Sequence, residues 1–333
     1  MMRKSAVFLM CAAAALGAPR ETLDIYFIDV EGGQATLIVT PAGESMLVDA
    51  GWPGFSGRDS DRIVKTARRA GLKQIDYMLV THYHLDHVGG VPELAAKFPL
   101  VTFVDHGDNT EANPATEKLA AAYYPVRAKG KHLVVKPGDK IPLRGADVTV
   151  VCARGQVIAK ALPGAGSPNP LCGAAERKKD DPSENARSIG FLLKFGKFSF
   201  ANLGDITWNT ELDLVCPANK LGTADVYLTT HHGLDASGPP QLVHALAPRV
   251  AIMNNGAKKG GSPAAWKIIH DSPRLKGFWQ LHYTLAAGPE YNAAEAYIAN
   301  MAAEGCGYGL HLAARQDGSF TLTNERTGYQ ETY

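Results

Sequence analysis

The chain has 333 residues, of which 45% are hydrophobic and 20% charged, with 34 basic side chains against 33 acidic ones. These proportions are those of a soluble globular protein and exclude a disordered or collagen-like chain. A formal net charge of +1 excludes a strong overall attraction to nucleic acid or to an anionic membrane. Net charge therefore does not support a nucleic-acid partner, although a local basic patch would still allow one.

The N-terminus predicts a secretory signal peptide over residues 1–18. Arg3 and Lys4 precede an apolar run of about 12 residues from Ser5 to Leu16, and small residues follow it before Pro19. Such a run is too short to span a bilayer, which takes about 20 apolar residues. We therefore expect an exported protein, periplasmic or extracellular, without stable membrane insertion.

Four cysteines remain after removal of that segment: Cys152, Cys172, Cys216 and Cys306. An even number in an oxidising compartment permits two disulfides, with three connectivities. The cysteines lie too far apart in the sequence for a zinc knuckle. The sequence leaves their pairing open.

The predicted elements of the first half begin with three short strands joined by hairpin-type turns, at 23–30, 35–40 and 45–51. Helical spacing follows at 61–70 and 111–123, and strands are expected at 77–82, 101–107, 132–136 and 147–152. Residues 154–184 are rich in Gly, Pro, Ala and charge, and they predict a long loop without regular structure.

The second half repeats this alternation. A hairpin is expected at 188–204, a helix at 210–215 and a strand that runs into a loop at 224–232. Helices and strands alternate over 239–315, and a terminal strand follows at 318–325. Two similar halves without a linker predict a single α/β domain over 19–333, with two sheets and helices outside them.

The strongest chemical signal is the segment THYHLDHVGG (81–90), which directly follows the predicted strand at 77–82. Three imidazoles and one carboxylate within six residues are costly to place together unless they share a cation, and this mixture suits Zn²⁺, Mn²⁺ or Fe. His82 and His84 are two apart and can point the same way, whereas Asp86 and His87 can point to a second position. A polar loop with satisfied histidines is the competing interpretation.

HYHLDH resembles the metal motif of the metallo-β-lactamase superfamily. The resemblance implies an αββα sandwich (α+β, four layers) with one or two metals at the strand ends between its halves. MLVDAG (46–51) is similar to the first motif of the family, which makes Asp49 a carboxylate that orients the metal loop. ANLGDIT (201–207) resembles the motif that supplies the bridging carboxylate, here Asp205, and LTTHHG (228–233) the motif with a histidine for the second metal.

The opening FIDVEGGQATLIVTPAGESMLVDAG (27–51) is similar to the ComEC-like branch, whose exported hydrolase domain is associated with DNA uptake. The HHG pair also matches that branch, as does Asn185 followed by Ser188 where other branches have a third histidine. The usual glycine–acid turn of the branch is replaced here by the four residues 31–34, Glu-Gly-Gly-Gln.

The resemblance implies two divalent metal ions, Zn²⁺ before Mn²⁺. It assigns His82 and His84 with Asp205 to a first site, completed by Asn185 as a weak ligand or by water or substrate oxygen. It assigns Asp86, His87 and either His231 or His232 to a second site, with Asp205 between the two. His231 is favoured because it directly follows the predicted strand.

The implied chemistry is hydrolysis by a metal-bound hydroxide, with Asp205 and Asp86 as catalytic carboxylates and Asp86 as a proton shuttle. Lys258 and His282 are candidates for contacts with substrate, whereas a lone histidine such as His106 is expected to be structural.

Three functions remain in competition. We expect a phosphodiesterase or nuclease first, a β-lactam or lactone hydrolase on the same metals second, and a non-catalytic binding protein third. The sequence carries no signal of oligomeric state.

Overall fold

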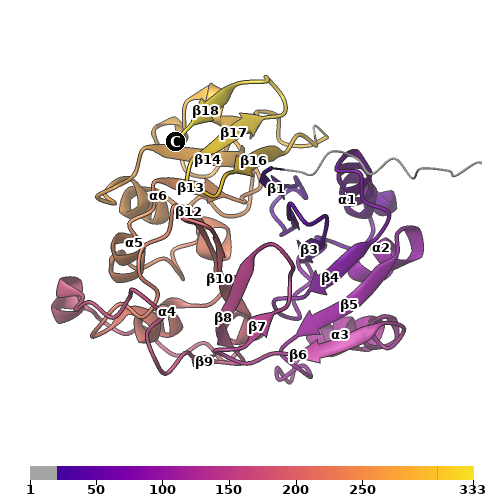
Figure 1. Ribbon diagram of the computed structural model, residues 1–333, viewed down its shortest axis with the longest axis horizontal. Helices are drawn as coiled ribbons and strands as arrows, with labels where there is room; N and C mark the ends of the chain where they lie inside the picture. Colours follow the sequence, from indigo (N-terminus) through magenta and orange to yellow (C-terminus); the bar gives the residue numbers. More distant parts are fainter. Residues whose placement is uncertain (1–20, 306) are drawn as a thin grey trace, which may run out of the picture.

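The computed structural model describes residues 21–305 and 307–333, so the predicted signal peptide at 1–18 and Cys306 lie outside the described residues. Within them, the strands form two nine-stranded sheets that share one apolar core (Figure 1). Phe27 of the first sheet and Phe200 of the second meet in this core edge to face, with ring centroids 5.9 Å apart. The two sheets therefore lie face to face.

The first sheet is antiparallel at one side and parallel at the other. Its order is β18 (Gln330–Thr332), β17 (Phe320–Asn324), β16 (Leu310–Ala314), β1 (Leu23–Phe27), β2 (Thr36–Val39), β3 (Ser45–Val48), β4 (Ile75–Leu79), β5 (Leu100–Asp105) and β6 (Lys131–Val134). Neighbours from β3 to β6 run parallel, so these strands end at the same edge.

The second sheet is built in the same way. Its order is β15 (Ile298–Asn300), β14 (Gly277–His282), β13 (Val250–Met253), β12 (Val226–Leu228), β11 (Phe198–Asn202), β10 (Gly190–Phe195), β8 (Asp147–Ala153) and β7 (Lys140–Ile141), with β9 (Gln156–Val157) beside β8. Strands β11 to β15 run parallel.

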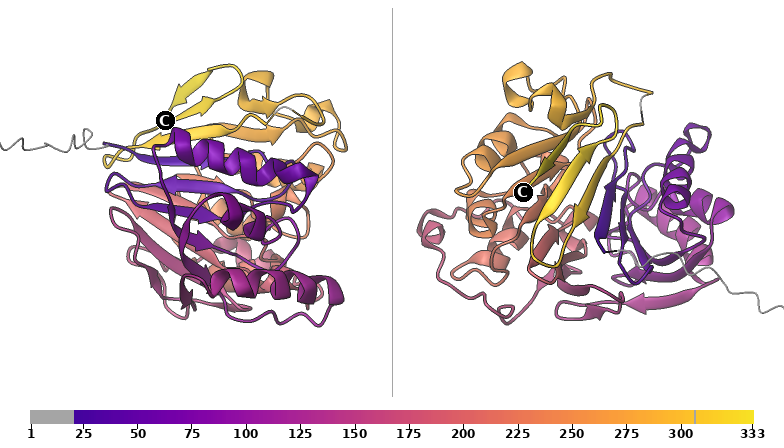
Figure 2. Two further views of the ribbon diagram at one scale, coloured as in Figure 1. Left: turned by 90° about the vertical axis from the view of Figure 1, so that its right-hand side faces the viewer. Right: turned by 45° about the horizontal axis from the view of Figure 1, so that its top comes forward.

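Helices cover the outer face of each sheet (Figures 1 and 2). An apolar cluster joins the first sheet to α1 (Arg58–Arg69), α2 (Val91–Lys97) and α3 (Pro114–Arg127). A second cluster joins the other sheet to α4 (Trp208–Val215), α5 (Pro240–Leu246) and α6 (Pro263–His270). The expected αββα sandwich is confirmed. None of the helices in the described part of the chain has the length and hydropathy needed to cross a bilayer.

The segment 154–184 is more ordered than its composition predicts. It contains β9 and the 3₁₀ helix η2 (Pro170–Ala174), and Cys172 of η2 forms a disulfide with Cys216. The Asn169 amide donates hydrogen bonds to the carbonyls of Val215 and Gln241. The disulfide and this amide anchor the loop, which the local sequence cannot reveal. Cys152 is buried with a free thiol.

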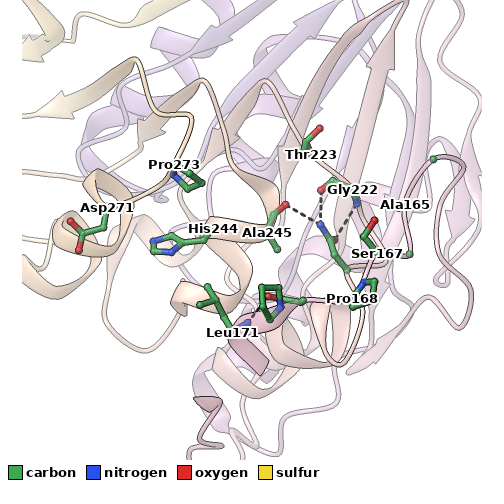
Figure 3. Close-up of a pocket in the computed structure, with 15 residues that line it drawn as sticks. Ala165, Ser167, Pro168, Leu171, Gly222, Thr223, His244, Ala245, Asp271 and Pro273 are labelled. Atoms are coloured by element: carbon green, nitrogen blue, oxygen red, sulfur yellow. Dashed lines mark hydrogen bonds between the residues drawn. The ribbon is translucent and has the colours of Figure 1, made fainter. Parts of the chain in front are cut away.

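A cavity of about 520 Å³ lies between residues 164–171 of this loop and the region of α5 and α6 (Figure 3). The Asn219 amide in its wall donates to the carbonyls of Gly222 and Ala245. The Asn219 side-chain oxygen accepts from the backbone N–H groups of Leu221 and Gly222. The Asn219 side chain thus forms hydrogen bonds that fix neighbouring segments of the chain to one another.

Candidate metal centre

The predicted metal-binding histidines and carboxylates follow the carboxyl ends of parallel strands. Asp49 follows β3, residues 82–87 follow β4, Asp205 follows β11, and His231 and His232 follow β12. Because parallel strands end at a common edge, segments that are distant in the sequence meet at one edge between the two sheets.

Four buried side chains bring their ligand atoms together: Asp86, His87, Asp205 and His232. His87 Nε2 lies 3.2 Å from Asp86 Oδ2, from Asp205 Oδ2 and from His232 Nε2. His232 Nε2 lies 3.2 Å from Asp86 Oδ2 and 3.3 Å from Asp205 Oδ2. These are five of the six separations among the four atoms, which all lie within 4.8 Å of one another. A regular tetrahedron with edges of about 3.2 Å has its centre about 2.0 Å from each corner, the length of a bond from zinc to nitrogen or oxygen. The four residues therefore fit a divalent cation.

The charges in this cluster also fit a cation. Burial alone would raise the pKa of Asp86 and Asp205, but the neighbouring histidines outweigh it and hold both pKa values well below their usual range. Burial opposes a charge on His87, yet these carboxylates and Asp49 raise its pKa well above the usual value. Without a metal ion, protons on His87 balance the negative charge of the two carboxylates. A metal ion would supply this positive charge instead, so metal binding must displace protons.

His82 presents a further free nitrogen. The Thr81 hydroxyl donates to Asp49 Oδ2 at 2.7 Å, so its oxygen accepts from His82 Nδ1 at 3.0 Å. His82 Nε2 is buried and has no hydrogen-bond partner in the described part of the chain. Burial and the nearby rings of His87 and His84 hold the pKa of His82 well below its usual value. The ring is therefore neutral and carries a lone pair suited to a metal.

His84 lies beside His82, with ring centroids 4.7 Å apart. Its Nε2 is 3.2 Å from Glu111 Oε2, which leaves Nδ1 as the nitrogen available to a cation. Glu111 was not singled out from the sequence, because its residue type and spacing carry no local signal.

His231 faces Asp205 from another position. Its Nδ1 lies 3.3 Å from Ser237 Oγ, and the Ser237 hydroxyl donates to the carbonyl of Ile206 at 2.8 Å. Nδ1 therefore carries the hydrogen, and Nε2 is left as an acceptor 3.8 Å from Asp205 Oδ2. The Asn185 amide nitrogen is 3.5 Å from that Nε2, and Asn185 Oδ1 is buried without a partner in the described residues.

The sequence favoured His231 as the partner of Asp86 and His87, whereas the structure places the ring of His232 beside them. Both histidines have left-handed backbone conformations, with φ of 55° and 56°, a region that costs free energy for non-glycine residues and clusters at functional sites. This backbone turns both rings toward Asp205, so both histidines present a nitrogen to it.

Residues around the cluster fix its rings. His232 Nδ1 lies 3.1 Å from the carbonyl of Asn254, which leaves Nε2 for the cation. A Cβ at Gly260 would lie 2.1 Å from the carbonyl oxygen of His232, and one at Gly90 would lie 2.0 Å from that of Ala50. Only glycine permits these close approaches.

The two predicted substrate contacts lie elsewhere. Lys258 is exposed, whereas the ammonium of its neighbour Lys259 contacts Asp86 Oδ2 and lies 5.0 Å from the centroid of the Trp52 ring. His282 is buried with Nε2 2.6 Å from Asp29 Oδ1. The pair of lysines in a glycine-rich loop was the sequence signal for Lys259, but the sequence does not say which lysine points inward.

Comparison with known proteins agrees with this arrangement. Residues 28–168 match the family described as the Metallo-beta-lactamase superfamily. A UPF0173 metal-dependent hydrolase of Anaeromyxobacter sp. (strain K) is 32% identical over 124 residues, which are 37% of this chain and 40% of that protein. ComE operon protein 3 of Bacillus subtilis (strain 168) is 25% identical over 189 residues, 56% of this chain and 20% of that protein.

Among solved structures, the metallo-β-lactamase fold protein YhfI from Bacillus subtilis is 11% identical, with a TM-score of 0.46 over 78% of this chain and 96% of that one. The chain spans about 40% of the length of the UPF0173 relatives that it matches. Residues 28–168 are thus similar to a metallo-β-lactamase superfamily domain, and the two sheets extend beyond them through the described chain.

Proposed function

We propose that the protein is an exported metal-dependent hydrolase that acts on phosphodiesters. The observation that carries this proposal is the cluster of four ligand atoms on Asp86, His87, Asp205 and His232, with an ammonium group beside it. Two divalent ions, Zn²⁺ before Mn²⁺, would be held by this cluster and by the free nitrogens of His82, His84 and His231.

Bound divalent cations would lower the pKa of water to near neutrality and polarise the group under attack. The chain's own residues would hold these ions and orient the reacting groups. Asp205 lies between His87 and His231 and would join the two halves of the site. Asp86 uses Oδ2 within the cluster, so its Oδ1 would accept the proton of the attacking water and pass it to the leaving oxygen.

Two features support an anionic substrate. Lys259 places a positive charge beside Asp86 and over the face of Trp52, where it would contact a phosphoryl oxygen. The alignment with ComE operon protein 3 supports a place in the ComEC-like branch. A β-lactam or lactone would use the same cluster but would draw less on Lys259.

The disulfide between Cys172 and Cys216 supports export. Disulfides persist in the periplasm and outside the cell, whereas cytosolic proteins are kept reduced. A periplasmic or extracellular location also agrees with the signal peptide predicted from the sequence.

The test is hydrolysis of bis(p-nitrophenyl) phosphate by protein loaded with Zn²⁺ or with Mn²⁺. Asp205→Asn removes a carboxylate that touches three histidines and is expected to abolish turnover and lower the metal content. Asp213→Asn is the matched control, because Asp213 is a half-exposed carboxylate of α4 paired with Arg177. Full activity in Asp205→Asn would contradict the proposal. A different result would be that protein holding two metals hydrolyses β-lactams or lactones but not the phosphodiester. That result would show that the substrate class is β-lactams or lactones and not phosphodiesters.

A further inference from the structure

A cavity of about 170 Å³ lies where β5, β6 and β8 end. This is several times the ~30 Å³ that a water molecule occupies in the liquid, so the cavity has room for a tetrahedral oxyanion. Its ionisable lining residues are His106, Lys136 and Arg154, and none of the residues that line it is acidic. We call this cavity the basic pocket.

Arg154 stands over the basic pocket without a counter-charge. No carboxylate in the described part of the chain forms an ion pair with it, and its Nη1 lies above Gly107, where a Cβ would be only 3.1 Å away. Its φ of 53° is left-handed, a conformation that costs free energy outside glycine. The backbone N–H of Arg154 donates to the carbonyl of Arg187 at 2.8 Å, which holds the turn in place.

His106 forms the buried wall of the basic pocket. It is 1% exposed, and its Nε2 lies 2.9 Å from Glu184 Oε2. Its Nδ1 is buried and has no hydrogen-bond partner within residues 21–305 and 307–333. The contact of Nε2 with Glu184 leaves Nδ1 as the ring atom of His106 that can form a hydrogen bond with a ligand in the basic pocket.

Lys136 lies at the rim of the basic pocket. Its ammonium is 2.9 Å from Asp139 Oδ1, and its side chain is 78% exposed. It adds positive charge at the entrance, but the recognition depends on Arg154 and His106.

Glu184 connects the basic pocket to the metal centre. Its Oε2 accepts from His106 and also, at 3.2 Å, from the backbone N–H of Tyr83, which lies between His82 and His84. Asn185, the next residue, contacts His231. The basic pocket and the metal-binding segment are therefore built on the same carboxylate and lie side by side.

We propose that the basic pocket binds a phosphate group of the substrate next to the phosphodiester that is cleaved. This inference rests on the proposed function. Arg154 supplies a planar fork of N–H donors that matches phosphate oxygens, and His106 supplies a buried ring nitrogen that can form a hydrogen bond with the phosphate group. The pocket gives the enzyme a preference for substrates with two neighbouring phosphates.

The first test measures binding without turnover. Chelator-treated, metal-free protein is titrated with inorganic phosphate by calorimetry. We expect saturable binding that is at least about 10-fold weaker in Arg154→Gln, because hydrogen bonds to charged groups are the strong ones. Arg315→Gln is the matched control, since Arg315 is exposed in the turn between β16 and β17. Equal affinity in Arg154→Gln, or no binding by the unaltered protein, would overturn the proposal.

The second test identifies the source of the phosphate. The metal-loaded enzyme is assayed on the dinucleotide TpT and on pTpT, which carries one further phosphate. We expect a lower KM for pTpT, and the ratio of the two KM values should move toward one in Arg154→Gln but not in Arg315→Gln. An unchanged ratio would overturn the assignment to substrate. Absence of all phosphodiester turnover would contradict the proposed function instead, while the calorimetric result would still decide whether the basic pocket binds phosphate.

Discussion

The Asp49 carboxylate lies 2.8 Å from Nδ1 of His87, so the opposite nitrogen of that ring points into the four-residue cluster. The same carboxylate accepts from the backbone N–H of Thr81 at 2.8 Å and from the Thr81 hydroxyl at 2.7 Å. Thr81 in turn accepts from His82. One buried carboxylate thus orients imidazoles in both halves of the candidate site.

Asp49→Asn should weaken metal binding and leave the fold intact. An amide can accept at one oxygen only, so either Thr81 or His87 loses its partner. Loss of such an outer partner typically costs 10–100-fold in metal affinity. Competition with a chromophoric chelator measures this affinity, and circular dichroism checks the fold. Asp61→Asn, an exposed carboxylate on α1, is the control; equal affinities in both variants would show that Asp49 has no orienting role.

Replacement of His232 and of His231 by alanine should have different effects. His232 Nε2 lies within 3.3 Å of both cluster carboxylates, whereas His231 Nε2 lies 3.8 Å from Asp205 alone. His232→Ala should therefore lose the ion held by the four-residue cluster. His231→Ala should keep that ion and lose affinity only in the other half of the site. Metal content after dialysis, measured by atomic spectroscopy, distinguishes the two variants. A greater loss of metal from the cluster in His231→Ala than in His232→Ala would contradict this geometry.

The metal motif could be predicted from sequence because its residues are neighbours in the chain. A strand followed by HYHLDH places its ligands by local geometry alone, and the two sheets with outer helices follow from strand and helix periodicity. The choice between His231 and His232 could not be made, because strand alternation does not hold where two successive residues take left-handed conformations.

Contacts between segments that are distant in the sequence explain the other differences between the predicted site and the structure. His282 meets Asp29, which is 253 positions away in the chain, and His84 meets Glu111, which lies in the loop before α3. Lys259 reaches Asp86 from a loop after β13, 173 positions away. No periodicity or short motif records such pairs, since they depend on how the two sheets pack.

Lys259→Met should raise the KM for bis(p-nitrophenyl) phosphate by about 10-fold or more, since hydrogen bonds from charged donors are worth roughly 1.5–3 kcal/mol. Metal affinity should not fall, because the substitution removes a positive charge beside Asp86. Steady-state kinetics and a metal titration measure the two effects. Lys258→Met changes the exposed neighbour and should leave both unaltered. A loss of metal in Lys259→Met would show that the lysine supports the cluster rather than the substrate.

Glu211 is a buried carboxyl group on α4, behind the loop that carries His231. It is fully buried, its Oε2 accepts from the backbone N–H of Gly238 at 2.7 Å, and its Oε1 has no partner in the described chain. Burial raises the pKa of Glu211 from 4.5 to about 8. The native protein thus retains a proton that the unfolded chain releases.

Glu211 should therefore make the protein less stable as pH rises. The contribution of Glu211 to the free energy of unfolding is complete below about pH 4.5. It declines by about 1.4 kcal/mol per pH unit above that pH and is lost as pH passes through about 8. Glu211→Gln cannot ionise, so this part of the decline should vanish. Denaturant unfolding of metal-free protein between pH 6 and 9 measures the slope. Glu117→Gln, an exposed position on α3, should keep the slope of the unaltered protein. Identical slopes in all three proteins would show that Glu211 is ionised in the native state across this range.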